Sequence, residues 1–388
     1  MKNTLPVFNI SFRPFFLLAA IIAIINVTFW VSAFVKGTDL GLVNFDPLFW
    51  HGHEMLFGFT SALIIGFLFT ASSHWTQTTP YRGCFLIFLV ALWLMERFSY
   101  FLNISHNWSI ILLNIFYPAS IILLFLKLRK NKQVYIFIPL LSTLWILSIL
   151  HTYGYMSDSL SLQDISKNSA SAIIRLLILL ILGRVIPFFT KSRFKDLDLK
   201  INVPKFVQRF SILTLIILAL PLSLFLSPSA IIIVYLICII FNTLRVLYWK
   251  PLIGMKEPMI AVLYIGSFAL VFGLVMELIG FFNGSIGFSQ APLHMLLAFG
   301  LGSVAIGMMT RVSLGHTGRI IKADKYIIIS FVFVIIGALI RVFVPIIWNE
   351  FYETSLHYAS GFWTLGFIIY LVKFFWPLVT KRPDGKFG

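Results

Sequence analysis

Two histidines and a glutamate begin an apolar stretch that is long enough to cross a membrane. They are His51, His53 and Glu54, in the motif HGHEMLFGF at residues 51–59. On an α-helix, positions i and i+2 differ by about 200°, so His51 and His53 would point to nearly opposite faces. They cannot both bind one ion unless the helix unwinds. The spacing therefore favours two histidines that serve two different centres.

Small residues follow on the face of the helix that carries His51. Gly52 lets a bulky group approach the backbone closely. Gly58, Ala62 and Gly66 then continue that face. Stripes of this kind allow close packing of another helix, or of a flat macrocycle, in a membrane.

A second apolar stretch, residues 294–316, carries a similar pattern. It begins at His294 and ends at His316, and Gly307 follows His294 at the same spacing as Gly66 follows His53. An internal repeat and a chance resemblance between glycine-rich spans both explain the pattern. Because His53 and His294 both begin their spans, we predict similar depths, as a haem with two histidine ligands requires.

Other polar residues within apolar segments have simpler interpretations. We expect His106 in an outer loop, and His151 and His357 at outer helix ends, where they remain candidate ligands. Glu96 and Arg97 are expected to form a structural ion pair. For Glu277, a carboxylate that supports a site, a proton carrier and an interfacial group all stay open.

Composition places the chain in a membrane. It is 59% hydrophobic and 11% charged, with a mean hydropathy of +0.95, whereas soluble domains carry about 25% charged residues. The first apolar run is long enough to span and shows no cleavable signal. Cys84 and Cys238 lie in apolar surroundings and suggest neither a disulfide framework nor a thiolate metal cluster.

The fold class predicted is an all-α polytopic integral membrane protein, with one membrane domain over residues 1–388 and no separate soluble domain. Each apolar segment is close to the ~20 residues that a helical span needs. Twelve segments are predicted, at 15–35, 48–72, 83–102, 108–127, 134–153, 170–190, 208–227, 229–248, 258–282, 290–311, 325–346 and 356–378.

The net charge of +16 reflects topology, and we expect no nucleic-acid partner. Lysines and arginines gather in alternate connections and at both ends, beginning with Lys2 and Arg13. By the positive-inside rule, both termini are cytoplasmic. The span that begins at HGHE then runs from outside to inside, with Asp46 as its N-cap and Pro47 at its first position.

Several ordered motifs resemble those of the NnrS family, membrane haem–copper proteins linked to the bacterial response to nitric oxide. They are SFRPFFLLAA (11–20), HGHEMLFGF (51–59), GFLFTA with WT (66–71, 75–76), GRVIPFFT (183–190), LHML (293–296) and MTRVSLGHTGR (309–319). The resemblance implies a twelve-span protein of the bacterial inner membrane, surrounded by the lipid bilayer.

The resemblance carries the family's motif residues onto His51, His53, His294 and His316, and onto Arg13, Arg184 and Arg311. The family more often has asparagine where this chain has His74, so that residue inherits no ligand role. The sequence lacks CxxCH, so a haem would be non-covalent.

For the ligands themselves, we predict that His53 and His294 hold haem iron while His51 assists a second metal, copper. The exchange of His51 and His53 between these roles stays open.

Arg184, Arg311 and His316 lie at cytoplasmic span ends, ~20–25 Å from the outer histidines at 1.5 Å per residue. One haem cannot easily use both levels. These residues therefore either form a separate cytoplasmic-side site, with a quinol or a second cofactor, or anchor the topology and stabilise a turn.

The function predicted is protection against nitrosative stress, by binding or processing nitric oxide or metal–nitrosyl species at a histidine-ligated centre. Whether the protein turns over a substrate stays open, because the sequence shows no electron-donor domain. A twelve-span transporter is an alternative, although no pair of broken helices stands out. A non-catalytic sensor or assembly factor for denitrification enzymes is another.

Overall fold

The computed structural model describes residues 5–221, 225–282 and 290–388, and every regular element in these residues is a helix. Lys2 and part of the predicted span 208–227 lie outside the described residues. Ten helical segments are long and apolar enough to cross a membrane: Phe12–Lys36, Pro47–Thr76, His106–Leu128, Val134–Met156, Leu160–Arg193, Pro228–Tyr248, Pro258–Gly280, Ala291–His316, Lys325–Ile347 and Asn349–Val379. The chain is therefore a polytopic membrane protein.

Two of the twelve predicted spans are shorter than expected. Residues 83–102 contain α4 (Cys84–Ser99), and residues 208–227 overlap with α9 (Lys205–Ala219). At 16 and 15 residues, both fall below the ~20 residues of an ordinary span. Twelve spans and cytoplasmic termini stay predictions.

The chain divides into two compact units. Unit 1 contains Met1–Ala170, Arg311–Ile321 and Phe367–Gly388, and unit 2 contains Ser171–Thr310 and Lys322–Gly366. The prediction of a single membrane domain over 1–388 is not tested by this division and stays a prediction.

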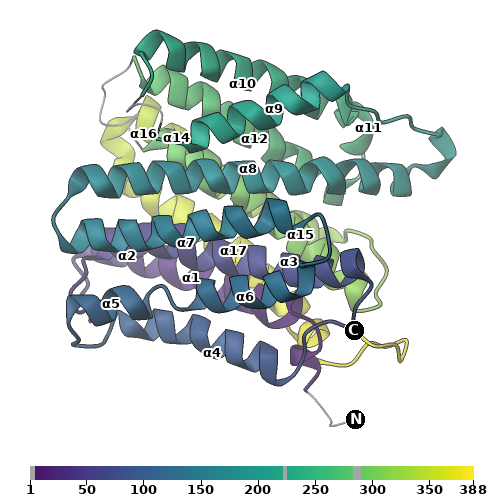
Figure 1. Cartoon of the computed structure of the whole chain (residues 1–388), viewed down its shortest axis with the longest axis horizontal. Coiled ribbons are helices and arrows are strands. Elements are labelled where there is room, and N and C mark those ends of the chain that lie inside the picture. Colours follow the sequence, from purple (N-terminus) through teal and green to yellow (C-terminus); the bar gives the residue numbers. More distant parts are fainter. Residues whose placement is uncertain (1–4, 222–224, 283–289) are drawn as a thin grey trace. The chain divides into compact units, whose positions relative to one another are not determined.

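Unit 1 is built around a span with an irregular middle. The α-helices α2 (Pro47–His53) and α3 (Thr60–Thr76) are joined by a π-helix, Glu54–Phe59. Both α3 and the π-helix pack against α1 (Phe12–Lys36). In Figure 1 the helices α4, α6 (Phe116–Leu128) and α7 (Val134–Met156) of this unit run nearly parallel, and the short α5 (His106–Leu112) precedes α6.

Unit 2 contains a second span of the same construction. A short helix, α14 (Ala291–His294), leads into a π-helix, Met295–Leu301, and then into α15 (Gly302–His316), whose last residues belong to unit 1. The π-helix packs against α12 (Pro258–Gly280) and α16 (Lys325–Ile347). The remaining long helices are α8 (Leu160–Arg193), α10 (Pro228–Tyr248) and α17 (Tyr352–Val379), of which α8 and α17 are shared with unit 1.

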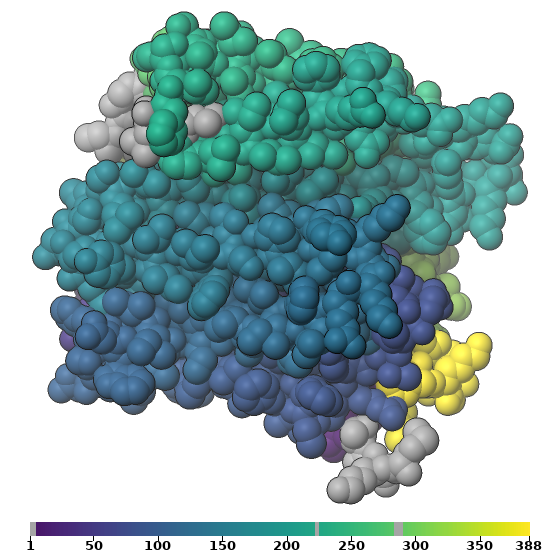
Figure 2. All heavy atoms as spheres, viewed as in Figure 1, coloured from purple at the N-terminus to yellow at the C-terminus, as the bar shows by residue number. Residues whose placement is uncertain are grey.

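Arg13 fixes the C-terminal segment of unit 1. Its side chain is fully buried and donates to four backbone carbonyl oxygens, those of Pro377, Leu378, Thr380 and Gly388, at 2.7–3.3 Å. Figure 2 shows this C-terminal segment, in yellow, at the surface of the molecule. The family-motif arginine at this position therefore has a structural role in this chain.

Replacement of Arg13 should release this segment. In Arg13→Gln, the carbonyl oxygens lose their charged donor, and each such bond contributes about 1.5–3 kcal/mol. We expect faster tryptic cleavage at the exposed Lys381 and Lys386, followed by mass spectrometry, together with a lower Tm. The exposed Arg129→Gln variant is the control, and equal cleavage of the two variants would contradict this role.

Candidate functional site

The HGHE span begins as the sequence predicts. Asp46 caps α2 by accepting a hydrogen bond from the Phe49 backbone N–H at 2.8 Å, and Pro47 occupies the first turn. His51 and His53 lie in the last turn of α2. They contact different helices, His51 meeting α1 and His53 meeting α4 and α7. The prediction that they face apart is confirmed.

The π-helix that follows His53 is held open by side chains. A π-helix has i→i+5 hydrogen bonds, and such insertions are frequent at functional sites. Thr60 donates to the Met55 carbonyl at 2.8 Å, while Ser61 and the Trp93 indole both donate to the Gly58 carbonyl, at 2.9 and 3.2 Å. The carbonyls of the widened turn are thereby satisfied inside the membrane.

The π-helix also corrects one prediction. Gly58, Ala62 and Gly66 were expected to form one stripe, but the extra residue in the turn rotates Gly58 away. A Cβ at Gly58 would collide with Glu54 and Arg97, whereas a Cβ at Gly66 would lie 3.0 Å from Phe15. Gly66 therefore serves the packing of α1, and Gly58 makes room for a guanidinium.

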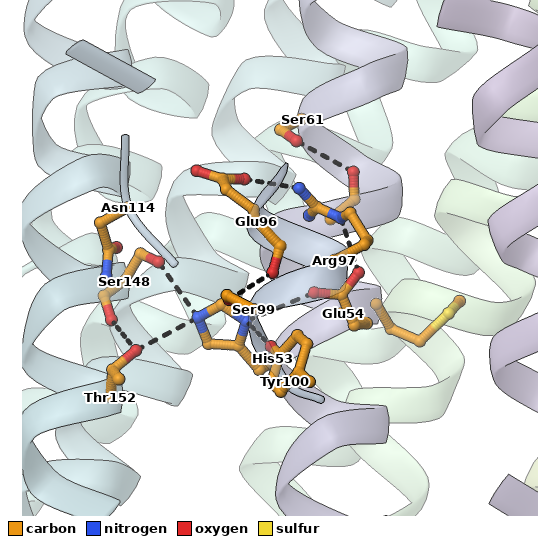
Figure 3. A network of polar contacts seen from close by, with 12 residues as sticks. His53, Glu54, Ser61, Glu96, Arg97, Ser99, Tyr100, Asn114, Ser148 and Thr152 are labelled. Carbon is orange, nitrogen blue, oxygen red and sulfur yellow. Dashed lines mark hydrogen bonds and ion pairs between the residues drawn. The ribbon is translucent and has the colours of Figure 1, made fainter. Parts of the chain in front are cut away.

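His53 is the centre of a buried polar network, drawn in Figure 3. The side chain is 1% exposed, and both ring nitrogens have partners. Nδ1 lies 2.7 Å from the Tyr100 hydroxyl, and Nε2 lies 3.3 Å from the hydroxyls of Ser148 and Thr152. Thr152 gives its own proton to the Ser148 carbonyl, so its oxygen accepts from Nε2–H and Nδ1 accepts from Tyr100.

Two carboxylates and one guanidinium adjoin His53. Arg97 donates from Nε to Glu54 at 2.8 Å and from Nη1 to Glu96 at 2.5 Å, and both carboxylates are buried. The predicted Glu96–Arg97 pair is confirmed, and Glu54 extends it. Two acids against one base leave a net charge of −1 unless a proton resides in the network. Uncompensated charge is costly inside a membrane, so we expect the network to hold that proton.

His151 is a member of the same cluster, near the end of α7 but packed inside the protein. It is buried at 6% exposure, and its ring centre lies 6.1 Å from that of His53. Phe49 stacks against both rings. The packing of α7 against α2 draws His151 inward, which the sequence of α7 does not reveal.

His51 has a different environment from His53. It is partly exposed, stacks on Trp30 with ring centres 4.3 Å apart, and its Nδ1 lies 2.6 Å from Asn26 Oδ1. An amide oxygen only accepts, so Nδ1 carries the proton and the lone pair of the neutral ring is on Nε2.

His294 in unit 2 has the same hydrogen-bonding pattern. Its Nδ1 lies 2.8 Å from the backbone carbonyl oxygen of Gln290, which again only accepts. The neutral ring therefore has its lone pair on Nε2. Because His53 and His294 belong to different units, their pairing stays a prediction.

An ion pair lies beside the π-helix of unit 2, as in unit 1. Arg175 donates two hydrogen bonds to Glu277, and the Tyr235 hydroxyl donates to the same carboxylate at 3.2 Å. A Cβ at Gly273 would lie 3.7 Å from the Leu296 nitrogen and 3.8 Å from Arg175. Among the roles left open for Glu277, this geometry favours a carboxylate that supports the site.

The remaining predicted residues lie elsewhere. Arg184 is exposed on α8 in unit 2, and Arg311 is partly buried on α15 in unit 1. His316 ends α15, next to His74. His106 and His357 are exposed.

The two units thus share one construction: a proline near the start of a span, a histidine that ends the first helix, a π-helix directly after it, and an arginine–glutamate pair alongside. Over residues 6–382, the chain matches the family described as NnrS protein. The chain belongs to the NnrS family. No curated protein matches this NnrS-family chain.

Sequence reasoning missed the partners of His53. They are Tyr100, Ser148 and Thr152, together with His151. One signal was present: Ser148, His151 and Thr152 have helical i, i+3, i+4 spacing, which puts three polar groups on one face of an otherwise apolar span.

Removal of Arg97 should destabilise this NnrS-family protein. In Arg97→Gln, two buried carboxylates lose their cation, which costs about 3–5 kcal/mol for a buried pair. We expect a clearly lower Tm in detergent. The additional change Glu54→Gln should recover part of the loss, because it removes one of the carboxylates.

The surface pair Arg193–Glu257 provides the control. Its Nε–Oε2 distance is 2.7 Å, but Arg193 is 59% exposed. Arg193→Gln should change the free energy of unfolding by less than about 1 kcal/mol. Equal effects of the two arginine variants would rule out a special role for the buried network.

Proposed function

We propose that this protein is a haem-binding membrane protein of the nitric oxide response, in which His51 of unit 1 and His294 of unit 2 each offer Nε2 to a haem iron. Membership of the NnrS family supplies the link to nitric oxide. In keeping with the family, we place the protein in the bacterial inner membrane, where the lipid bilayer surrounds its spans.

One observation carries the ligand assignment. His51 and His294 each bind a fixed oxygen acceptor through Nδ1, the side-chain amide of Asn26 in one case and the Gln290 carbonyl in the other. Histidines that ligate metals almost always donate their other ring N–H to such an acceptor, which fixes the tautomer and makes Nε2 more basic. His294 directly precedes a π-helix, and His51 lies three residues before the start of the other, a feature frequent at functional sites.

The same criterion, the hydrogen bonds of the ring nitrogens, argues against His53 as a haem ligand. The sequence-based prediction had paired His53 with His294. Its Nε2 is turned toward the Ser148 and Thr152 hydroxyls, and its Nδ1 meets Tyr100. A ring that is 1% exposed and bonded at both nitrogens presents no ligand atom to a haem. We therefore exchange the two roles, as the sequence left open, and assign His53 to the proton-holding network.

Copper does not fit the outer cluster. His51 and His53 face apart and cannot bind one ion together. No group of three metal-ligating side chains occurs among the residues that the structure describes. We assign copper no ligands in this cluster.

When bound, the haem would supply an iron that binds nitric oxide. The residues of the chain then have distinct tasks. Trp30 and Asn26 orient the His51 ring from two sides. Arg97, Glu54 and Glu96 hold a proton one helix turn away. Arg184, Arg311 and His316 stay candidates for a separate cytoplasmic-side site, for example for a quinol.

Visible absorption spectra test the ligand assignment. Protein expressed with ample haem should show a Soret band, and His51→Ala and His294→Ala should each shift it or abolish it. His106→Ala, an exposed histidine, is the control and should leave the band unchanged. Protein that is expressed with ample haem and still shows no Soret band would exclude the proposal.

His53→Ala separates the two versions of the assignment. We expect the Soret band to persist, with a lower Tm, because the change removes a hydrogen-bonded core residue rather than a ligand. Loss of the band in His53→Ala, with retention in His51→Ala, would restore the original pairing.

Nitric oxide binding is tested on the reduced, haem-loaded protein. Addition of nitric oxide under anaerobic conditions should shift the Soret band in the wild type. An unchanged spectrum would show that the haem of this protein does not bind nitric oxide directly. It would favour a role as an assembly factor for denitrification enzymes.

A further inference from the structure

His74 and His316 come together in unit 1, far along their spans from the outer histidines. Their ring centres lie 5.7 Å apart at an angle of 54°. His74 is in the last turn of α3, and His316 is the last residue of α15. The two histidines are far apart in the sequence, and the fold brings them together.

The separation suits two ligands of one metal ion. With metal–nitrogen bonds of about 2.0–2.1 Å, a ring centre lies ~3.2 Å from the ion. Two imidazoles then have centres ~5.2 Å apart at the tetrahedral angle and ~6.4 Å apart when opposed. The observed 5.7 Å falls between these limits.

The two imidazoles are also available for coordination. In the part of the chain that the structure describes, neither His74 nor His316 makes a side-chain hydrogen bond; only their backbone carbonyls accept, from Gln77 and Arg382. His74 is exposed and His316 is partly buried, so an ion has a path from solvent.

The electrostatics of the backbone favour a cation here. Both histidines lie at helix C-termini, where the partial charge of the macrodipole is negative. The nearby cation Arg382 is neutralised by Asp384, with contacts of 2.9 and 2.6 Å, and this pairing lowers the pKa of Asp384 to about 2. The positive charge of Arg13 is likewise offset, by the four backbone carbonyl oxygens that accept its hydrogen bonds.

The site is held in place by rigid neighbours. Arg382 donates to the His316 carbonyl at 3.1 Å, and the Phe12 ring packs 5.5 Å from the His316 ring. We infer that His74 and His316 form a transition-metal site that takes an imidazole-binding ion such as Zn²⁺, with water completing the coordination. This inference does not depend on the haem proposal.

Zinc titration of the full-length protein, purified without a polyhistidine tag, tests the inference by calorimetry. The wild type should bind Zn²⁺, and His74→Asn should weaken this binding at least tenfold, because one imidazole cannot chelate. His74→Cys should retain it, since thiolate is also a zinc ligand. A purely structural role for His74 would not be rescued by cysteine.

His106→Asn is the matched control, because His106 is also exposed and no histidine ring packs against it among the residues of unit 1 that the structure describes. It should bind Zn²⁺ like the wild type. The inference is overturned if His74→Asn binds as tightly as the wild type, or if His106→Asn loses as much affinity as His74→Asn. Because His74 is exposed, a folding failure is not expected, and circular dichroism of each variant checks this.

Discussion

The burial of the Arg97 guanidinium between two carboxylates is the constraint on which unit 1 depends. Charges inside a membrane are stable only in compensated groups, and here the group joins α4 to the π-helix of the HGHE span. Room for the guanidinium exists only because residue 58 is glycine. The widened helix, the glycine and the ion pair therefore form one connected arrangement, and the position of His53 is fixed by it.

This arrangement gives different environments to His51 and His53, which are only two positions apart in the sequence. His53 is enclosed by hydroxyl groups and works as a hydrogen-bonded interior residue. His51, on the opposite face, stacks on Trp30 and donates a hydrogen bond from Nδ1 to Asn26, which leaves the lone pair of the neutral ring on Nε2. His294 has the same tautomer next to the second π-helix. His51 and His294 therefore share the hydrogen bond at Nδ1, whereas His53 and His294 share the position directly before a π-helix.

The two units strengthen the case for an internal repeat. Each has a histidine directly before a π-helix and an arginine–glutamate pair, Arg97 with Glu54 of the π-helix itself in one and Arg175 with the partly exposed Glu277 of α12 in the other. The π-helices are one more feature that the two spans share, and the internal repeat stays a prediction. His74 and His316, by contrast, arise from neighbouring helix ends within unit 1.

The sequence alone determined the membrane class, ten of the spans, the Asp46 cap and the opposed faces of His51 and His53, because apolar length, capping residues and helical periodicity are local properties. It did not reveal the two π-helices, the first of which contacts Trp93 and Arg97 from another helix. Nor did it reveal which histidine is enclosed. Tertiary packing decided this, since the partners of His53 come from α4 and α7, and hydrogen bonds between distant segments leave no periodic signal in a single sequence.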